Sequence, residues 1–206
     1  MHSPSNDTPV VEYTIAQDNI ILSVGGRWDK FAKENDAVEL ADGGVIGTSI
    51  WQWITGEETK HLLASIFRRV RDSQTSVTIP YRCDSPDVRR HLYFQACPEE
   101  DGRMRLVHRI LREEARSIRE TLLDRGRAHS EALLTMCSWC CKIKTADTWT
   151  ELEDAVAQLS LLSTETPPLI THGICISCEE RVFLQLDAQP QSLRTPSVMP
   201  ESGAGG

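Results

Sequence analysis

The fold is decided by residues 76–111, SVTIPYRCDSPDVRRHLYFQACPEEDGRMRLVHRIL. Apolar and polar side chains alternate in three runs of this stretch, which is typical of strands with one buried face. The residues between the runs, Asp84-Ser-Pro-Asp87 and Asp101-Gly102, suit turns. The stretch therefore predicts a meander of three antiparallel strands. The three runs cover residues 76–83, 90–97 and 103–111.

The upstream residues predict helices and two further strands. Residues 57–72 carry apolar side chains three and four positions apart, which indicates a long helix with one buried stripe. Short apolar runs at 19–24 and 45–47 predict strands, and residues 28–35 show helical spacing. Strands and helices followed by a meander favour an α+β domain, one antiparallel sheet with helices on one side. The stripe of the long helix consists of Leu62, Leu63, Ile66, Phe67 and Val70.

This order of elements resembles a PAS sensory domain. Residues 28–32 (WDKFA), 45–49 (VIGTS) and 81–86 (YRCDSP) are similar to stretches of that family. The resemblance implies that residues 12–112 form a five-stranded antiparallel sheet whose inner face can hold a small ligand. PAS domains hold haem, a flavin or a metabolite there, or leave the cavity empty. They relay a signal through a helix that leaves the last strand.

Residues 113–134 are predicted to form such a connecting helix. Apolar side chains recur with the spacing of a coiled-coil seam, so a homodimer through residues 111–122 is one expectation. The alternative is a helix that packs back on its own domain. Several arginines also make the segment basic, and we interpret them as a solvated face. The seam consists of Leu111, Ala115, Ile118 and Leu122.

Two Cys-x-x-Cys pairs define a metal module in residues 135–186. In each pair, which we call a knuckle, the spacing lets both sulfurs point at one ion. Two knuckles supply four soft ligands, which suit a tetrahedral zinc ion, and an iron–sulfur cluster is the alternative. The first knuckle is placed after a helix, so a thioredoxin-like redox dithiol is the less favoured interpretation. The predicted metal ligands are Cys137, Cys140, Cys175 and Cys178.

A helix is predicted between the two knuckles, at residues 148–162, with a capping box of Thr148 and Glu151. It would close the long gap between them and make the module a small helical one. The knuckles, the intervening Trp149 and the stretch THGICISC (residues 171–178) resemble a C-terminal segment found after PAS or receiver domains in bacterial signalling proteins. That segment usually carries lysine where this chain has Cys141.

The other candidate side chains are given structural roles. Cys141 is interpreted as a free thiol, and His172 as a turn histidine, although either could take part in the metal site. Cys83 and Cys97 are interpreted as core or surface thiols. His108 lies on the apolar face of the last strand, where a hydrogen-bonded core histidine is favoured over a cofactor ligand.

The composition limits the partners. The formal net charge is −8, which opposes general binding to nucleic acid or anionic membranes. No apolar run is long enough to span a bilayer, and no signal peptide is visible, so a cytoplasmic protein is expected. Residues 1–11 and 187–206 are polar and rich in Pro, Ser or Gly, which predicts disordered tails.

The sequence therefore predicts a non-enzymatic signal-sensing or adaptor protein of bacterial type, with a structural zinc site and a possible signalling partner. No kinase, cyclase or phosphate-binding glycine motif is visible. One alternative is a thiol-based redox or metal sensor, since oxidation of thiolates would release the metal. Another is a zinc-dependent nucleic-acid-binding regulator that uses the arginine-rich segment.

Overall fold

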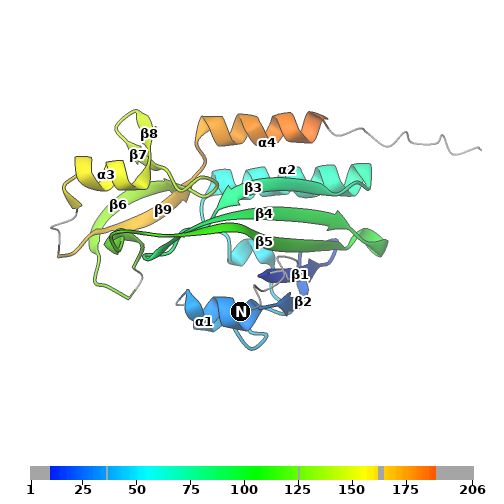
Figure 1. Cartoon of the computed structure of the whole chain (residues 1–206). Coiled ribbons are helices and arrows are strands. Elements are labelled where there is room, and N and C mark those ends of the chain that lie inside the picture. Colours follow the sequence, from blue (N-terminus) through cyan, green and yellow to red (C-terminus); the bar gives the residue numbers. More distant parts are fainter. Residues whose placement is uncertain (1–9, 36, 125, 162–164, 189–206) are drawn as a thin grey trace, which may run out of the picture.

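A computed structural model of the chain describes residues 10–35, 37–124, 126–161 and 165–188. Within this part, five antiparallel strands form one sheet in the order β2-β1-β5-β4-β3, with the helices α1 and α2 against it (Figure 1). The predicted α+β class and the five-stranded antiparallel sheet are confirmed. The elements are β1 (Val11–Ile15), β2 (Ile21–Gly26), α1 (Trp28–Glu34), α2 (Glu57–Ser73), β3 (Val77–Arg82), β4 (Val88–Pro98) and β5 (Met104–Ala115).

The alternating pattern of the meander places the predicted faces in the core. Val77 and Ile79 of β3 are fully buried, and so are Phe94 and Ala96 of β4. The stripe of α2 joins them in one buried cluster, except that Leu63 lies at its edge. Each large apolar side chain that is buried here contributes about 1.5–3 kcal/mol of transfer free energy, and this holds the helix on the sheet.

The fifth strand lies elsewhere than predicted. Residues 45–47 form turns, and Gly47 has a φ of +81°, which an extended strand does not allow. The missing strand is β1, which pairs with both β2 and β5 and begins inside the predicted N-terminal tail. Its alternation of Val11, Tyr13 and Ile15 was present in the sequence. The predicted tails otherwise lie outside the described residues, and α4 (Ile176–Ala188) extends two residues into the second one.

The predicted connecting helix at 113–134 is wrong. The hairpin that pairs Pro98 with Met104 continues, with a shift of register between His91 and Leu92, until Val88 pairs with Ala115, so β5 takes up the first part of the segment. A 3₁₀ turn (Thr121–Leu123) and strand β6 (Ser130–Cys137) follow. Hydrogen bonds to β4 satisfy the backbone groups of β5. The spacing of side chains in the segment does not reveal that such a partner strand is present. The homodimer predicted through 111–122 loses the helix on which it depended.

The C-terminal part is a second, mixed sheet with the order β8-β7-β6-β9, in which β6 and β9 run parallel. The helix predicted at 148–162 is only partly correct, because its first residues form a strand. Thr148 does not cap the helix, since its hydroxyl donates to the carbonyl of Thr145 at 3.3 Å. The remaining elements are β7 (Ile143–Thr145), β8 (Thr148–Thr150), α3 (Leu152–Gln158) and β9 (Pro168–Gly173).

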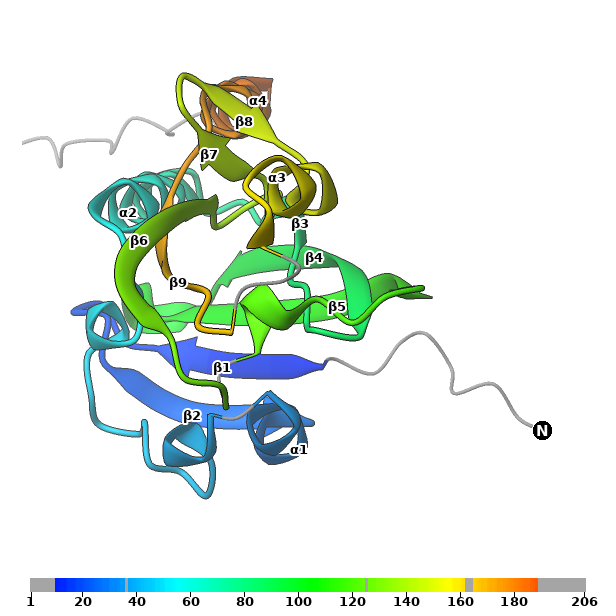
Figure 2. The same cartoon turned by 90° about the vertical axis from the view of Figure 1, so that its left-hand side faces the viewer.

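The two sheets share one hydrophobic core. Cys137, Trp139 and Val182 belong to the same buried cluster as the stripe of α2. The backbone N–H of Arg82 donates to the carbonyl of Trp139 at 2.8 Å, which ties β3 to the first knuckle. α4 runs alongside α2 and β3 (Figure 1), while β7, β8 and α3 gather at the opposite end of the view from α1 (Figure 2). The cysteine module is therefore packed against the five-stranded sheet and is not separated from it by a connecting helix.

Candidate metal centre and sheet cavity

The two knuckles meet because they leave neighbouring parallel strands at the same end. β6 ends at Cys137 and β9 ends at Gly173, and these two residues are partners in the parallel ladder. Parallel strands end at one edge of a sheet, so Cys175 follows β9 close to where Cys137 closes β6. This pairing, not a helix, closes the long gap between the knuckles.

The four sulfur atoms of Cys137, Cys140, Cys175 and Cys178 lie within 4.8 Å of one another. The sulfurs of Cys140 and Cys175 are 3.7 Å apart. A tetrahedral ion with metal–sulfur bonds of about 2.3 Å holds its sulfur ligands about 3.8 Å apart, so the arrangement fits zinc. All seven cysteines of the chain are described and free of disulfides, and the cluster is buried except at Cys140, which is partly exposed.

The charges of the cluster explain why a cation suits it. The hydrogen bond from Cys140 lowers the pKa of Cys137 well below its usual value, and the same contact raises the pKa of Cys140 to about 12. Hydrogen bonds with Cys137 and Cys140 raise the pKa of Cys178 still further. One thiolate among neutral thiols is the favourable state of the protein alone, because like charges repel in a buried site. Four thiolates require the charge of a bound metal.

Several donors surround the sulfurs. The backbone N–H of Cys175 donates to the sulfur of Cys137 at 3.4 Å, as expected of a knuckle. The guanidinium of Arg181, one helical turn further along α4, donates to the sulfur of Cys178 at 3.1 Å. These donors favour thiolates, and Arg181 would offset part of the net negative charge of a four-thiolate zinc site.

The two uncertain side chains lie outside the sulfur cluster. Cys141 is buried, and burial raises the pKa of its thiol. His172 lies on β9, where its Nδ1 atom is 3.2 Å from the hydroxyl of Thr55. Among the described residues the ligand group therefore contains four cysteines and neither of these two. Cys97 lies on β4 and Cys83 directly follows β3; both are partly buried and form no disulfide.

The first knuckle does not follow a helix, although this predicted position was the reason to disfavour a redox dithiol. The first knuckle follows strand β6, not a helix, because the predicted connecting helix does not exist. The second knuckle also follows a strand, and Cys178 lies in the first turn of α4. A thioredoxin-like pair occupies such a position, so it is the convergence of all four sulfurs that favours a metal over a redox dithiol.

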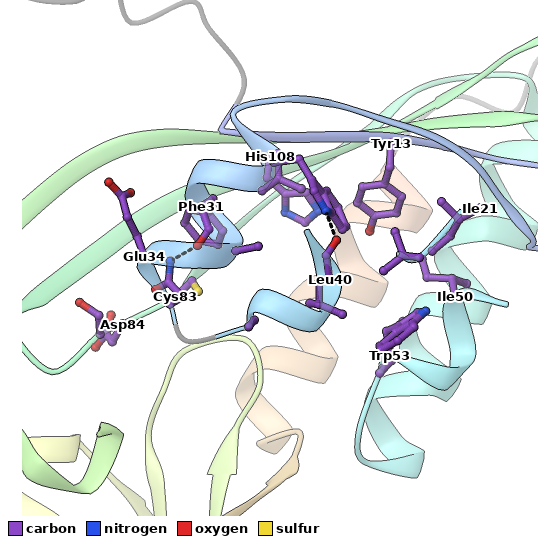
Figure 3. A pocket seen from close by; sticks show the side chains of 18 of the residues that line it. Tyr13, Ile21, Phe31, Glu34, Leu40, Ile50, Trp53, Cys83, Asp84 and His108 are labelled. Carbon is purple, nitrogen blue, oxygen red and sulfur yellow. Dashed lines mark hydrogen bonds between the residues drawn. The ribbon is translucent and has the colours of Figure 1, made fainter. Parts of the chain in front are cut away.

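A cavity of about 370 Å³ lies beside the inner face of the five-stranded sheet (Figure 3). It includes His108 of β5, whose Nδ1 atom is 2.7 Å from the Tyr81 hydroxyl. Burial lowers the pKa of His108 to about 4, so the imidazole is neutral at pH 7. His108 is thus the hydrogen-bonded histidine that was predicted. Tyr13, which stacks on His108 with ring centroids 5.8 Å apart, was missed, although the alternation of β1 would have revealed it.

A buried ion-pair network connects the cavity with the cysteine module. The Asp84 carboxylate, whose side chain is 0% exposed, pairs with Arg82 at 2.5 Å and with Arg116 at 2.6 Å. Arg82 also reaches Glu151 at 2.8 Å, at the N-terminus of α3. Asp84 itself contributes to the cavity wall. The network therefore fixes the two sheets in one relative position.

The arginines that made residues 103–127 basic are largely paired with carboxylates. Arg103 pairs with Asp101, Arg105 with Glu12 and Arg119 with Asp87. A guanidinium that already binds a carboxylate is less available to a phosphate group. Within the described part of the chain, no helix combines the length and apolar character that a membrane span needs.

Comparisons with known proteins leave the family open. No protein-family model matches the chain, and no curated protein sequence matches it. A solved domain of an HTR-like protein from Haloarcula marismortui is similar over 50% of this chain and 97% of that domain. The identity is 16% and the TM-score 0.35, values at which the likeness carries no argument about fold or function.

Proposed function

We propose that this chain is a non-enzymatic signal-sensing or adaptor protein of the bacterial cytoplasm, with one structural zinc ion in the four-cysteine site. The supporting observation is that the four sulfurs converge inside the same core as the sheet that carries the cavity. Free cysteines throughout the chain fit a reducing compartment. The PAS-like domain would bind a ligand or partner, and the cysteine module would hold or present the response.

The chemistry of the ligand set favours a structural metal over a catalytic one. Four thiolates fill all positions of a tetrahedral zinc ion and leave none for a substrate or a water molecule. Zinc would fix the ends of β6 and β9 and the start of α4 at one point. Trp139, which lies in the sequence between Cys137 and Cys140, would then be held in contact with Tyr81 and Phe94 of the five-stranded sheet.

Metal analysis of the purified chain tests this proposal. We expect about one zinc ion per chain and no visible absorption, as a closed zinc site implies. Cys140→Ser and Cys175→Ser should lose zinc to a chelator at concentrations that leave the parent protein loaded. Cys141→Ser and Cys97→Ser are the matched controls and should retain it. A folded chain that is purified without metal, or a Cys175→Ser variant that holds zinc as tightly as the parent, contradicts the proposal.

A thiol-based redox sensor is the second candidate, and the exposure of one ligand favours it. Cys140 is the partly exposed member of the four-cysteine cluster, so an oxidant can reach its sulfur. Peroxide should then oxidise Cys140 first and release the metal from the folded protein. Titration with peroxide, with metal release and circular dichroism followed together, distinguishes the two. A site that keeps its metal until the protein denatures excludes the redox sensor.

A further inference from the structure

The sheet cavity has a definite chemistry, which begins with its size and walls. Its volume of about 370 Å³ would take a ligand of about 15 non-hydrogen atoms at the packing density of a protein interior. This is one or two rings, and much less than a haem. The walls are largely apolar and aromatic. Trp28 lines the space, and Figure 3 shows Phe31, Leu40, Ile50 and Trp53 around it.

The charges at the wall disfavour an anionic ligand. Among the described residues, the lining contains the carboxylates of Glu34 and Asp84 but no lysine or arginine. Asp84 is already paired with Arg82 and Arg116, so these guanidinium groups are engaged in the network. A carboxylate or phosphate placed in the cavity would lose its hydration and gain no counter-ion.

The direction of the hydrogen bond between Tyr81 and His108 determines which ring nitrogen of His108 carries the proton. Burial raises the pKa of Tyr81, so its hydroxyl keeps its proton and can donate it to His108 Nδ1, which is 2.7 Å away. With the Tyr81 hydroxyl as the donor, the neutral imidazole accepts at Nδ1 and carries its own proton on Nε2. His108, which lines the cavity, then offers an N–H donor at Nε2. This tautomer is assigned from the direction of the hydrogen bond with Tyr81.

Tyr13 adds a second polar group to the same wall. Its ring stacks on His108 and meets Trp28 edge-on, with centroids 5.6 Å apart. Figure 3 shows the rings of Tyr13 and His108 extending from the sheet toward Leu40 and Ile50. Among the described residues, neither the Tyr13 hydroxyl nor His108 Nε2 has a protein hydrogen-bond partner. By contrast, the Trp28 indole N–H is used by the carbonyl of Leu40 at 2.7 Å.

We propose that the cavity binds an uncharged aromatic molecule of one or two rings whose carbonyl or ring nitrogen accepts a hydrogen bond from His108 Nε2. The proposal rests on the proposed sensory function and names the ligand class of that site. An unpaired N–H donor in an apolar cavity costs free energy, because it has lost its hydrogen bond to water. An acceptor on the ligand offsets this cost by pairing with the donor. A simple ammonium or guanidinium group offers no acceptor to the His108 N–H, and the Asp84 carboxylate is already paired with Arg82 and Arg116. The aromatic walls favour a flat ring in offset or edge-on contact.

Three probes of equal size and shape test this proposal. Acetylnaphthalene carries a neutral acceptor, isopropylnaphthalene has none, and naphthoate is an anion, each substituted at the same ring position. Calorimetric titration into the zinc-loaded full chain should show acetylnaphthalene binding about fivefold more tightly than isopropylnaphthalene, as one net hydrogen bond implies. Naphthoate should bind at least tenfold more weakly than acetylnaphthalene, since its charge is desolvated without a partner.

Variants show whether His108 provides the donor. His108→Phe should abolish the preference for acetylnaphthalene and leave the affinity for isopropylnaphthalene within about twofold. Tyr81→Phe removes one oxygen and frees Nδ1 to take the proton, so the preference should fall even if His108→Phe does not fold. His61→Phe, the same change at an exposed position of α2, is the control and should keep the preference.

Three outcomes would overturn the proposal: tightest binding of naphthoate, an unchanged preference in His108→Phe or Tyr81→Phe, or no binding of any probe. A chain that carries zinc but binds none of the probes rejects the ligand class and leaves the structural metal site standing. A chain without zinc rejects the proposed function whatever the probes do. The two failures are therefore distinguishable.

Discussion

Trp139 provides the most direct test of the shared core. It is 5% exposed, and its ring lies near Tyr81 and Phe94, with centroid distances of 6.3 and 6.5 Å. Replacing a buried tryptophan by alanine costs about 3–5 kcal/mol of unfolding free energy. We expect the upper part of this range for Trp139→Ala. The proposed metal would hold the cysteines on both sides of Trp139 in place, so the space left behind could not collapse.

Trp139→Phe should behave differently. The indole Nε1 atom is buried and has no hydrogen-bond partner among the described residues. An unpaired buried donor costs about 1–3 kcal/mol, and phenylalanine removes it while keeping an aromatic ring in place. The lost contact area and the removed penalty should nearly cancel. We expect the unfolding free energy of Trp139→Phe to lie within about 1 kcal/mol of the parent value.

Urea denaturation of the zinc-loaded chain, followed by far-ultraviolet circular dichroism, measures both variants. Leu184→Ala, at a position of α4 that is 69% exposed, is the control and should change the free energy by less than about 0.5 kcal/mol. The reasoning fails if Trp139→Ala leaves the transition of the sheet domain in place and lowers only a separate, earlier transition. That result would mean that the cysteine module unfolds on its own and shares no core with the sheet.

Three further predictions concern the ion pairs, the buried histidine and the metal. Asp84→Asn should cost about 3 kcal/mol in urea denaturation, because Arg82 and Arg116 lose a buried partner, while the exposed pair at Asp101→Asn should cost less than about 0.5 kcal/mol. Burial lowers the pKa of His108 to about 4, so as the pH falls the unfolded chain binds a proton at this residue before the folded chain does. Between pH 7 and 5.5 the unfolding free energy of the parent should therefore fall by about 1 kcal/mol more than that of His108→Phe. An equal fall in both proteins contradicts the assignment of a buried neutral imidazole. Chelation of the metal should lower the thermal midpoint by several degrees and raise amide exchange first in β6, β9 and α4; an unchanged midpoint would show that the metal contributes nothing to folding.

Local patterns were sufficient for part of the fold and of the site. The alternation in β3 and β4 and the stripe of α2 reflect a buried face that each element carries by itself, so they predict the element correctly. The two Cys-x-x-Cys spacings likewise predict sulfurs that can converge in pairs, because the geometry of a knuckle is local. The same logic could have found β1, whose apolar residues alternate around Tyr13.

Local patterns failed where the backbone found a distant partner. Residues 111–122 have helical spacing, yet β4 already presents the groups that pair with residues up to Ala115, where β5 ends. Ile118, a member of the predicted seam, is 68% exposed, while Leu122 is buried in the small second core with Ile143 and Leu152. A spacing of three and four residues therefore did not determine the structure of this segment.

Residues close along the chain were enough to predict the four candidate sulfur ligands, the meander and the long helix. That Cys137 and Cys175 meet follows only from the tertiary fold, because the parallel pairing of β6 with β9 joins residues more than thirty positions apart. The tertiary fold also decided the cavity, where Tyr13 of β1 and His108 of β5 face one space. Such contacts follow from which strands become neighbours, and the free energy that selects those neighbours is distributed over the whole core.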